Sequence, residues 1–248
     1  GIQADLKTFS ALGCYGASAI TAITAQNTLG VSAIHDCPPD IVRAQINDVL
    51  SDLDVKAIKI GMLSRVETIV AVAECLKAYP HIPVVLDPVM VATSGDALLA
   101  PEAERAIVEH LFPLALLITP NLAEAARLTG TPIAETEEDR IAQADQLAQM
   151  GAPHILIKGG HGNDAEAVDL LFRGEEITKF ASPRIDTKNT HGTGCTLSSA
   201  IAANIAMGLD IIEAVQNAKD YVYGAIEASD RLAVGRGNGP THHFYQWW

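Results

Sequence analysis

Asn189-Thr190-His191-Gly192-Thr193-Gly194-Cys195-Thr196 is a glycine-rich turn that leads into an apolar helical pattern from about Thr193 to Met207. Glycines let the backbone approach a ligand closely, and the free N–H groups and dipole of a helix start favour negative charge. The turn is not a Walker loop, because the pattern GxxxxGK[ST] occurs nowhere in the chain. A glycine-rich helix start also permits tight packing, so the stretch alone leaves an anion site and a packing role open.

The sequence around this turn alternates short apolar runs with longer segments of helical period. Such alternation is typical of βαβ units around a mainly parallel sheet. The runs after residue 50 are nearly all apolar, which predicts strands buried on both faces. The expected strands are Ala17 to Ala25, Val31 to Ile34, Ala57 to Gly61, Pro83 to Asp87, Leu114 to Thr119 and His154 to Lys158.

After Lys158 the pattern changes. Ala167 to Phe172 and Glu176 to Phe180 flank Arg173-Gly174-Glu175, which predicts an antiparallel hairpin at one edge of the sheet. Helices are expected from Asp40 to Leu53 and from Ile211 to Arg231. No linker-like or low-complexity stretch interrupts the chain, so we expect a single α/β domain over residues 1–248.

Composition excludes several classes of function. The formal net charge of −13 argues against nucleic acid as a partner, because phosphate backbones are held by clustered Lys and Arg. No apolar run approaches the roughly 20 residues that span a bilayer. The cysteines have neither zinc-ligand spacing nor the density of a disulfide scaffold, so we expect a protein of the reducing cytoplasm; they are Cys14, Cys37, Cys75 and Cys195.

Polar side chains follow several expected strands where each strand ends. Lys158 ends one strand, Asn121 and Glu124 follow another, and Asp87 ends a third. Ligands of open α/β sheets bind beyond the carboxyl ends of the strands. One cation, two carboxylates and an anion hole on one edge are the components of phosphoryl transfer with Mg²⁺.

Each of these residues also has a purely structural explanation. Glu124 suits the first turn of a helix, Lys158 can lie along the surface, and Asp87 can cap the turn made with Pro88. Any one of them alone favours that explanation. Their occurrence together favours a site.

The segment Lys188 to Thr196 resembles the signature of the hydroxymethylpyrimidine/phosphomethylpyrimidine kinases, which are members of the ribokinase-like superfamily. The resemblance implies a three-layer α/β/α sandwich with a mainly parallel central sheet and an antiparallel edge hairpin, the cofactors ATP and Mg²⁺, and a homodimer. Five further stretches agree and extend from one end of the chain to the other: Gly1-Ile2-Gln3-Ala4-Asp5-Leu6-Lys7-Thr8, Thr24-Ala25-Gln26-Asn27-Thr28, Lys59-Ile60-Gly61-Met62-Leu63, Asp87-Pro88-Val89-Met90 and Leu156-Ile157-Lys158-Gly159-Gly160-His161.

The implied reaction is phosphorylation of 4-amino-5-hydroxymethyl-2-methylpyrimidine, and then of its monophosphate, for thiamin synthesis. On the acceptor side, the resemblance implies that Gln26 hydrogen-bonds the aminopyrimidine and that Gly61 and Met62 lie against its ring. On the donor side, Gly192, Thr193 and Gly194 form the anion hole, Lys158 meets the ATP phosphates, Asn121 and Glu124 organise the metal and its waters, and Asp87 completes the metal shell.

Cys195 stands where many superfamily relatives carry Asp. A helix N-terminus stabilises a thiolate, so we interpret Cys195 as the general base for the hydroxymethyl group. A phosphate acceptor has a second pKa of about 6 and is already ionised, so the second transfer hardly needs a base. A small cysteine that packs the helix start is the alternative.

Three further expectations follow. Relatives have a first strand and a Ser/Gly-rich loop before the match to Gly1, so we expect a longer working protein or an altered pyrimidine pocket. A pyridoxal or pyridoxine kinase and a non-catalytic pyrimidine or nucleotide sensor are the rival functions. Other notable segments are Val31 to Pro39, a candidate flap; Arg236 to Pro240, a loop near the nucleotide or a plain connection; and His242, His243, Trp247 and Trp248, a packing or interface tail.

Overall fold

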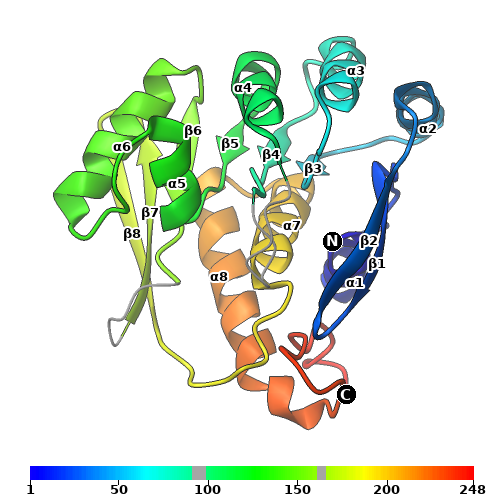
Figure 1. Cartoon of the computed structure of the whole chain (residues 1–248). Helices are drawn as coiled ribbons and strands as arrows, with labels where there is room; N and C mark the ends of the chain where they lie inside the picture. Colours follow the sequence, from blue (N-terminus) through cyan, green and yellow to red (C-terminus); the bar gives the residue numbers. More distant parts are fainter. Residues whose placement is uncertain (91–98, 161–165) are drawn as a thin grey trace.

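The computed structural model describes residues 1–90, 99–160 and 166–248 (Figure 1). Helices and strands alternate along most of the chain, as expected. In chain order the elements are α1 (Ile2–Ala11), β1 (Ala22–Asn27), β2 (Gly30–Asp36), α2 (Pro39–Asp52), β3 (Ile58–Ile60), α3 (Val66–Lys77), β4 (Val84–Leu86), α4 (Pro101–His110), the 3-10 turn η1 (Phe112–Leu114), β5 (Leu117–Ile118), α5 (Leu122–Thr129), α6 (Glu137–Gln149), β6 (His154–Ile157), β7 (Glu166–Arg173), β8 (Glu176–Pro183), α7 (Thr193–Ala206), α8 (Ile211–Glu227) and the 3-10 turn η2 (Ser229–Arg231).

The central sheet has the strand order β3-β4-β5-β6-β7-β8. The first four strands are parallel to one another, and the pairs β6–β7 and β7–β8 are antiparallel. The tight turn of the edge hairpin pairs Arg173 with Glu176, and Gly174 there has a φ of 61°. The prediction of a mainly parallel sheet with an antiparallel edge hairpin is confirmed.

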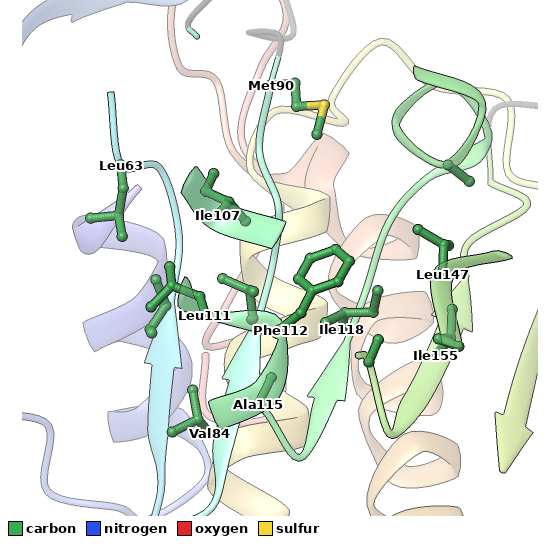
Figure 2. Packing of buried hydrophobic residues seen from close by; sticks show 14 of the residues in the cluster. Leu63, Val84, Met90, Ile107, Leu111, Phe112, Ala115, Ile118, Leu147 and Ile155 are labelled. Carbon is green, nitrogen blue, oxygen red and sulfur yellow. The ribbon is translucent and has the colours of Figure 1, made fainter. Parts of the chain in front are cut away.

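Alternate residues of the buried strands enter two separate cores. Val84 and Leu86 of β4 pack with α3 and α4 on one face, whereas Val85 packs with α7 and α8 on the other. Figure 2 shows Phe112 and Ile118 beside Ile107 in the first core. Phe112 is completely buried, so its truncation to Ala should cost about 3–5 kcal/mol. The molecule is therefore the expected three-layer α/β/α sandwich, with α1, α7 and α8 in one outer layer.

Two strand predictions were wrong at their boundaries. The strand that was expected to begin at Ala17 begins only at Ala22. This strand, β1, pairs with β2 in a separate two-stranded antiparallel sheet (Figure 1). The strand expected from Leu114 is shorter as well, because Phe112–Leu114 forms a 3-10 turn around Pro113. Proline lacks the N–H that a ladder needs, so pairing begins only after it.

None of the helices in the described ranges is long and apolar enough to cross a membrane.

Candidate active site

The N-terminus of α7 is the centre of the site. Its N-cap, Gly192, has a φ of 82°, a left-handed conformation that suits glycine. No side chain of the described residues caps this helix start, whereas Asn121 caps α5 and Asp210 caps α8. The first N–H groups of an α-helix have no partners within the helix. The start of α7 therefore offers donors and a positive dipole end to an anion.

Two threonine hydroxyl groups fix the conformation of this turn. The Thr196 hydroxyl donates to the Gly192 carbonyl at 2.7 Å and lies 3.0 Å from Nε2 of His243. Thr193 donates from its hydroxyl to the Thr190 carbonyl at 2.7 Å. These contacts hold the glycine turn against the body of the domain, so its N–H groups are set in direction before a ligand arrives.

An ion pair between Lys158 and Asp87 lies beside the turn. The Lys158 ammonium is 2.8 Å from Asp87 Oδ1, which also accepts the Thr119 hydroxyl at 3.0 Å. Burial opposes ionisation of Asp87, but Lys158 and Lys59 outweigh it and lower the pKa of this carboxyl. A Cβ atom on Gly194 would lie 3.5 Å from Lys158 Nζ. The ammonium thus faces the start of α7.

Asn121 and Glu124 form a reciprocal cap at the start of α5. Asn121 Oδ1 accepts from the Glu124 N–H at 2.9 Å, and Glu124 Oε2 accepts from the Asn121 N–H at 2.8 Å. Burial raises the pKa of Glu124 to about 7; Lys158 opposes this shift and Asp87 adds to it. Glu124 therefore caps the start of α5, as its structural explanation predicts. In addition, it is electrostatically coupled to the Lys158–Asp87 pair.

Within the described residues, no three or more His, Cys, Asp or Glu side chains form a group that could hold a metal ion. The donor set nonetheless suits Mg²⁺, which keeps several waters and uses one or two carboxylates plus substrate phosphates. Asp87 Oδ2 would lie 3.8 Å from a Cβ atom on Gly194, and Glu124 is electrostatically coupled to Asp87, so these carboxylates could supply such ligands.

The α7 turn also lines a cleft of about 990 Å³. Its lining brings together five predicted residues from three parts of the chain: Gln26, Gly61, Met62, Gly192 and Cys195. Asp87, Asn121, Glu124, Lys158, Thr193 and Gly194 are not among its lining residues. The predicted residues therefore form two groups, which meet at residues 192–195.

The sequence interpretation missed Lys59, Asp5 and Ser199. Lys59 Nζ and the Ser199 hydroxyl both lie 2.8 Å from Asp5 Oδ1. A signal for Lys59 was available, because it interrupts an apolar buried strand, and a buried lysine requires a partner. No comparable pattern marks Asp5, since an acid in the first turns of a helix is ordinary.

Other segments noted in the sequence have defined places. His161 lies outside the described residues. His242 and His243 are buried, which confirms packing for that part of the tail, whereas Trp247 and Trp248 are exposed. The loop of Arg236 to Pro240 connects two parts of the site: Gly237 N–H donates to the Thr28 hydroxyl at 3.2 Å, and the Gly239 carbonyl accepts from the His191 N–H at 3.0 Å.

Comparisons with known proteins agree with this geometry. The hydroxymethylpyrimidine/phosphomethylpyrimidine kinase of Rhizobium meliloti (strain 1021) is 59% identical over 248 residues, which cover 100% of this chain and 93% of the relative. An ADP complex of Bacillus subtilis pyridoxal kinase has a TM-score of 0.91 at 38% identity and covers 99% of this chain and 92% of its own. The phosphomethylpyrimidine kinase of Clostridium difficile 630 has a TM-score of 0.80 at 44% identity, with coverage of 91% and 93%.

These similarities extend over the central sheet, the α7 turn and the cleft, and they confirm the ribokinase-like fold. The family described as phosphomethylpyrimidine kinase matches residues 1–242, which include every predicted site residue. The chain belongs to the phosphomethylpyrimidine kinase family.

Proposed function

We propose that the chain transfers the γ-phosphoryl group of ATP twice, first to the hydroxymethyl group of 4-amino-5-hydroxymethyl-2-methylpyrimidine and then to the phosphate of the product. As a member of its family it is a phosphotransferase that acts on thiamin precursors and uses ATP. The observation that carries the proposal is that the α7 turn lines the cleft through Gly192 and Cys195 and also lies close to the Lys158 ammonium at Gly194.

On the donor side, the ammonium of Lys158 binds the phosphates of ATP. The Gly194 N–H stabilises negative charge on the phosphoryl group during transfer, and Thr193, whose own N–H donates to the Thr190 carbonyl at 3.2 Å, holds the turn in place. Support comes from the uncapped start of α7 and from the Asp87 contact that holds Lys158 in place. Such preorganised donors contribute most of the catalysis in phosphoryl transfer, since the transition state is loose.

Asp87 and Glu124 are the proposed carboxylates for Mg²⁺, and Asn121 orients Glu124 through the reciprocal cap. When bound, Mg²⁺ neutralises charge on the β- and γ-phosphates. Besides the cap through Oε2, the Glu124 carboxylate interacts with the backbone of Met90, which follows Asp87 by three residues. Asn121 is thereby a positioning residue for Glu124.

On the acceptor side, Gln26 hydrogen-bonds the aminopyrimidine, and Gly61 and Met62 contact its ring. The hydroxymethyl oxygen attacks the γ-phosphorus, ADP leaves, and the hydroxyl proton passes to Sγ of Cys195, the proposed base. The common cleft of these residues supports the assignment. In the second transfer a phosphate oxygen attacks, and no proton has to be removed because that acceptor is ionised near neutral pH.

Pyridoxal is a second candidate substrate, because a pyridoxal kinase has a TM-score of 0.91 to this chain at 38% identity. Pyridoxal is also a flat heteroaromatic ring with a hydroxymethyl group. The pocket residues Gln26 and Met62 favour the aminopyrimidine as the main substrate. Turnover of pyridoxal beside the pyrimidine, measured with the same enzyme, separates a single from a dual activity.

The remaining proposals concern assembly and location. Strands β1 and β2 and the turn between them expose Ile23, Ile34 and Leu29, and exposed apolar side chains of this kind support a homodimer as the working assembly. Residues 1–248 act as one kinase domain of the cytoplasm, without nucleic acid or membrane as a partner. Light scattering tests the dimer, and the variant Ile23→Ser with Ile34→Ser should shift it toward monomer.

The central experiment is a product assay with ATP, Mg²⁺ and the hydroxymethylpyrimidine, with mono- and diphosphate resolved by mass. We expect the monophosphate to appear first and the diphosphate to follow. No phosphorylated pyrimidine, with turnover of pyridoxal instead, would reassign the substrate. Ligand binding without consumption of ATP would indicate a sensor.

A further inference from the structure

Lys59 is a buried cation that has no role yet in either of the two proposed phosphoryl transfers. In β3 its neighbours Ile58 and Ile60 pack in the core shared with α3 and α4. Because side chains alternate along a strand, Lys59 lies on the opposite face, toward α7. Its side chain is only 3% exposed. A charge so deeply buried requires compensation within the protein.

Asp5 supplies part of this compensation. Its carboxylate joins three elements, because Oδ1 lies 2.8 Å from Lys59 Nζ on β3 and 2.8 Å from the Ser199 hydroxyl on α7. An ammonium group has three N–H donors, and this contact uses one of them. For the described residues, Asp5 is the one hydrogen-bond partner recorded for Lys59 Nζ. The group therefore has capacity to bind a further anion.

The ammonium lies at the floor of the acceptor cleft. A Cβ atom on Gly61 would be 3.0 Å from Lys59 Nζ, and both residues line the cleft together with Cys195. Burial opposes the charge of Lys59, but Cys195, Asp5 and Asp87 outweigh it and raise the pKa of this group. Lys59 therefore stays cationic at the pH of any kinase assay, within the electrostatic reach of the proposed base.

The other lysines near the cleft are less suitable than Lys59 for binding an anion inside it. Lys7 and Lys56 are both exposed, and Lys56 pairs at 2.7 Å with the exposed carboxylate of Asp54. Lys158 is not a lining residue and is held by Asp87 on the donor side. In a chain with a net charge of −13, an anionic acceptor has few cations to meet.

We propose that Lys59 binds the phosphate of the monophosphate acceptor and so enables the second transfer; this inference rests on the two-step function proposed above. In the first transfer the acceptor is a neutral alcohol. In the second, an acceptor phosphate must approach the γ-phosphate of ATP, and their repulsion in a low-dielectric cleft must be neutralised. Lys59 is thus a specificity-determining residue that acts on one of the two acceptors.

The test compares the purified enzyme with Lys59→Met, Lys59→Arg and the control Lys179→Met, an exposed lysine of β8 outside the cleft lining, using the alcohol and the monophosphate as separate acceptors. Lys59→Met should lower kcat/KM for the monophosphate at least about tenfold more than for the alcohol, mainly through KM. It should also weaken the dependence of that KM on salt, since one charge pair is lost. Lys59→Arg should restore part of the second transfer, and Lys179→Met should change neither.

Two further measurements separate this role from a structural one. Lys59→Met leaves Asp5 without its cation, so the double variant Asp5→Asn with Lys59→Met must show the same loss of selectivity. Calorimetry of the pyrimidine monophosphate without ATP should show binding weakened by more than about tenfold in Lys59→Met. Equal losses for both acceptors, or unchanged binding of the monophosphate, would overturn the inference. Binding that depends on Lys59 in an enzyme without turnover would overturn only the proposed function.

Discussion

The Nζ atom of Lys158 and the Oδ1 atom of Asp87 lie 2.8 Å apart, although 71 residues separate them in the chain. Lys158 follows β6 and Asp87 follows β4, with β5 between them in the sheet. Thr119, which follows β5, donates its hydroxyl to the same Asp87 oxygen at 3.0 Å. The three strand ends therefore act as one unit that holds a buried cation toward α7.

This pair should serve both stability and catalysis, and a double variant separates the two. Removing only the cation in Lys158→Met strands a buried carboxylate and should cost about 3–5 kcal/mol in urea unfolding. The double variant Asp87→Asn with Lys158→Met should recover most of that loss and yet transfer no phosphoryl group. Activity in the double variant would contradict the donor-side assignment. Lys179→Met, on the edge strand β8, is the control.

Replacing the thiol should affect the two transfers unequally. Cys195→Ser should slow phosphorylation of the hydroxymethyl group at least about tenfold more than phosphorylation of the monophosphate, because only the alcohol must lose a proton. Single-turnover assays with each acceptor measure this ratio. The predicted ratio is opposite to that of Lys59→Met. Equal losses would mean that Cys195 packs the helix start and is not a base.

Much of this site could be predicted from the sequence, because its residues lie at strand ends or in a glycine turn. The ends of parallel strands meet at one edge, so Asp87, Asn121 and Lys158 could be grouped before any contact was known. The sequence could not predict that the site residues as a whole divide into two groups that meet at residues 192–195. It depends on which side of α7 each strand end faces, and local sequence does not record this.

The network around Lys59 was hidden for a different reason. Asp5 and Ser199 are 194 residues apart, and each is unremarkable in its own helix. The separate β1–β2 sheet was also missed, since a short exposed hairpin and a strand of the main sheet share the same local propensity. Both the Lys59 network and the β1–β2 sheet depend on contacts between residues distant in the sequence, which local patterns do not contain.

Glu124→Gln distinguishes a capping role from a metal role. Gln keeps an acceptor for the Asn121 N–H, so a residue that only caps should tolerate the change. As a metal carboxylate, Glu124 should be needed for activity, and the variant should lose at least about tenfold in kcat/KM and require more Mg²⁺. If activity and its dependence on Mg²⁺ are unchanged, Glu124 only caps the helix and does not bind the metal.

The same variant has a signature in stability. The pKa of Glu124 is raised to about 7 from 4.5, so its stabilising contribution is complete below about pH 4.5 and is lost as pH rises through 7. Glu124→Gln should therefore gain stability over the wild type across this window, by a few kcal/mol at most. Saturating ATP and Mg²⁺ should narrow the difference, because the metal stabilises the ionised wild-type side chain.

His243 should make the helix start sensitive to acid. Burial, and then Lys7, lower the pKa of His243 to about 4 from 6.5, so the folded protein favours the neutral ring. Its contribution to stability is therefore complete above about pH 6.5 and is lost as pH falls toward 4. Because the ring contacts the Thr196 hydroxyl, which in turn binds the Gly192 carbonyl, protonation should loosen the anion hole as well.

His243→Gln keeps a polar atom near Thr196 and cannot gain a proton. Relative to the wild type it should flatten the loss of unfolding free energy between about pH 6.5 and 4, a difference of up to about 3 kcal/mol. Urea unfolding across this range measures the effect, with the exposed His35→Gln as control. Since Glu124 acts in the opposite direction over nearly the same window, the wild-type profile alone would hide both groups. Parallel profiles for His243→Gln and the wild type would show that this histidine does not couple protonation to the helix start.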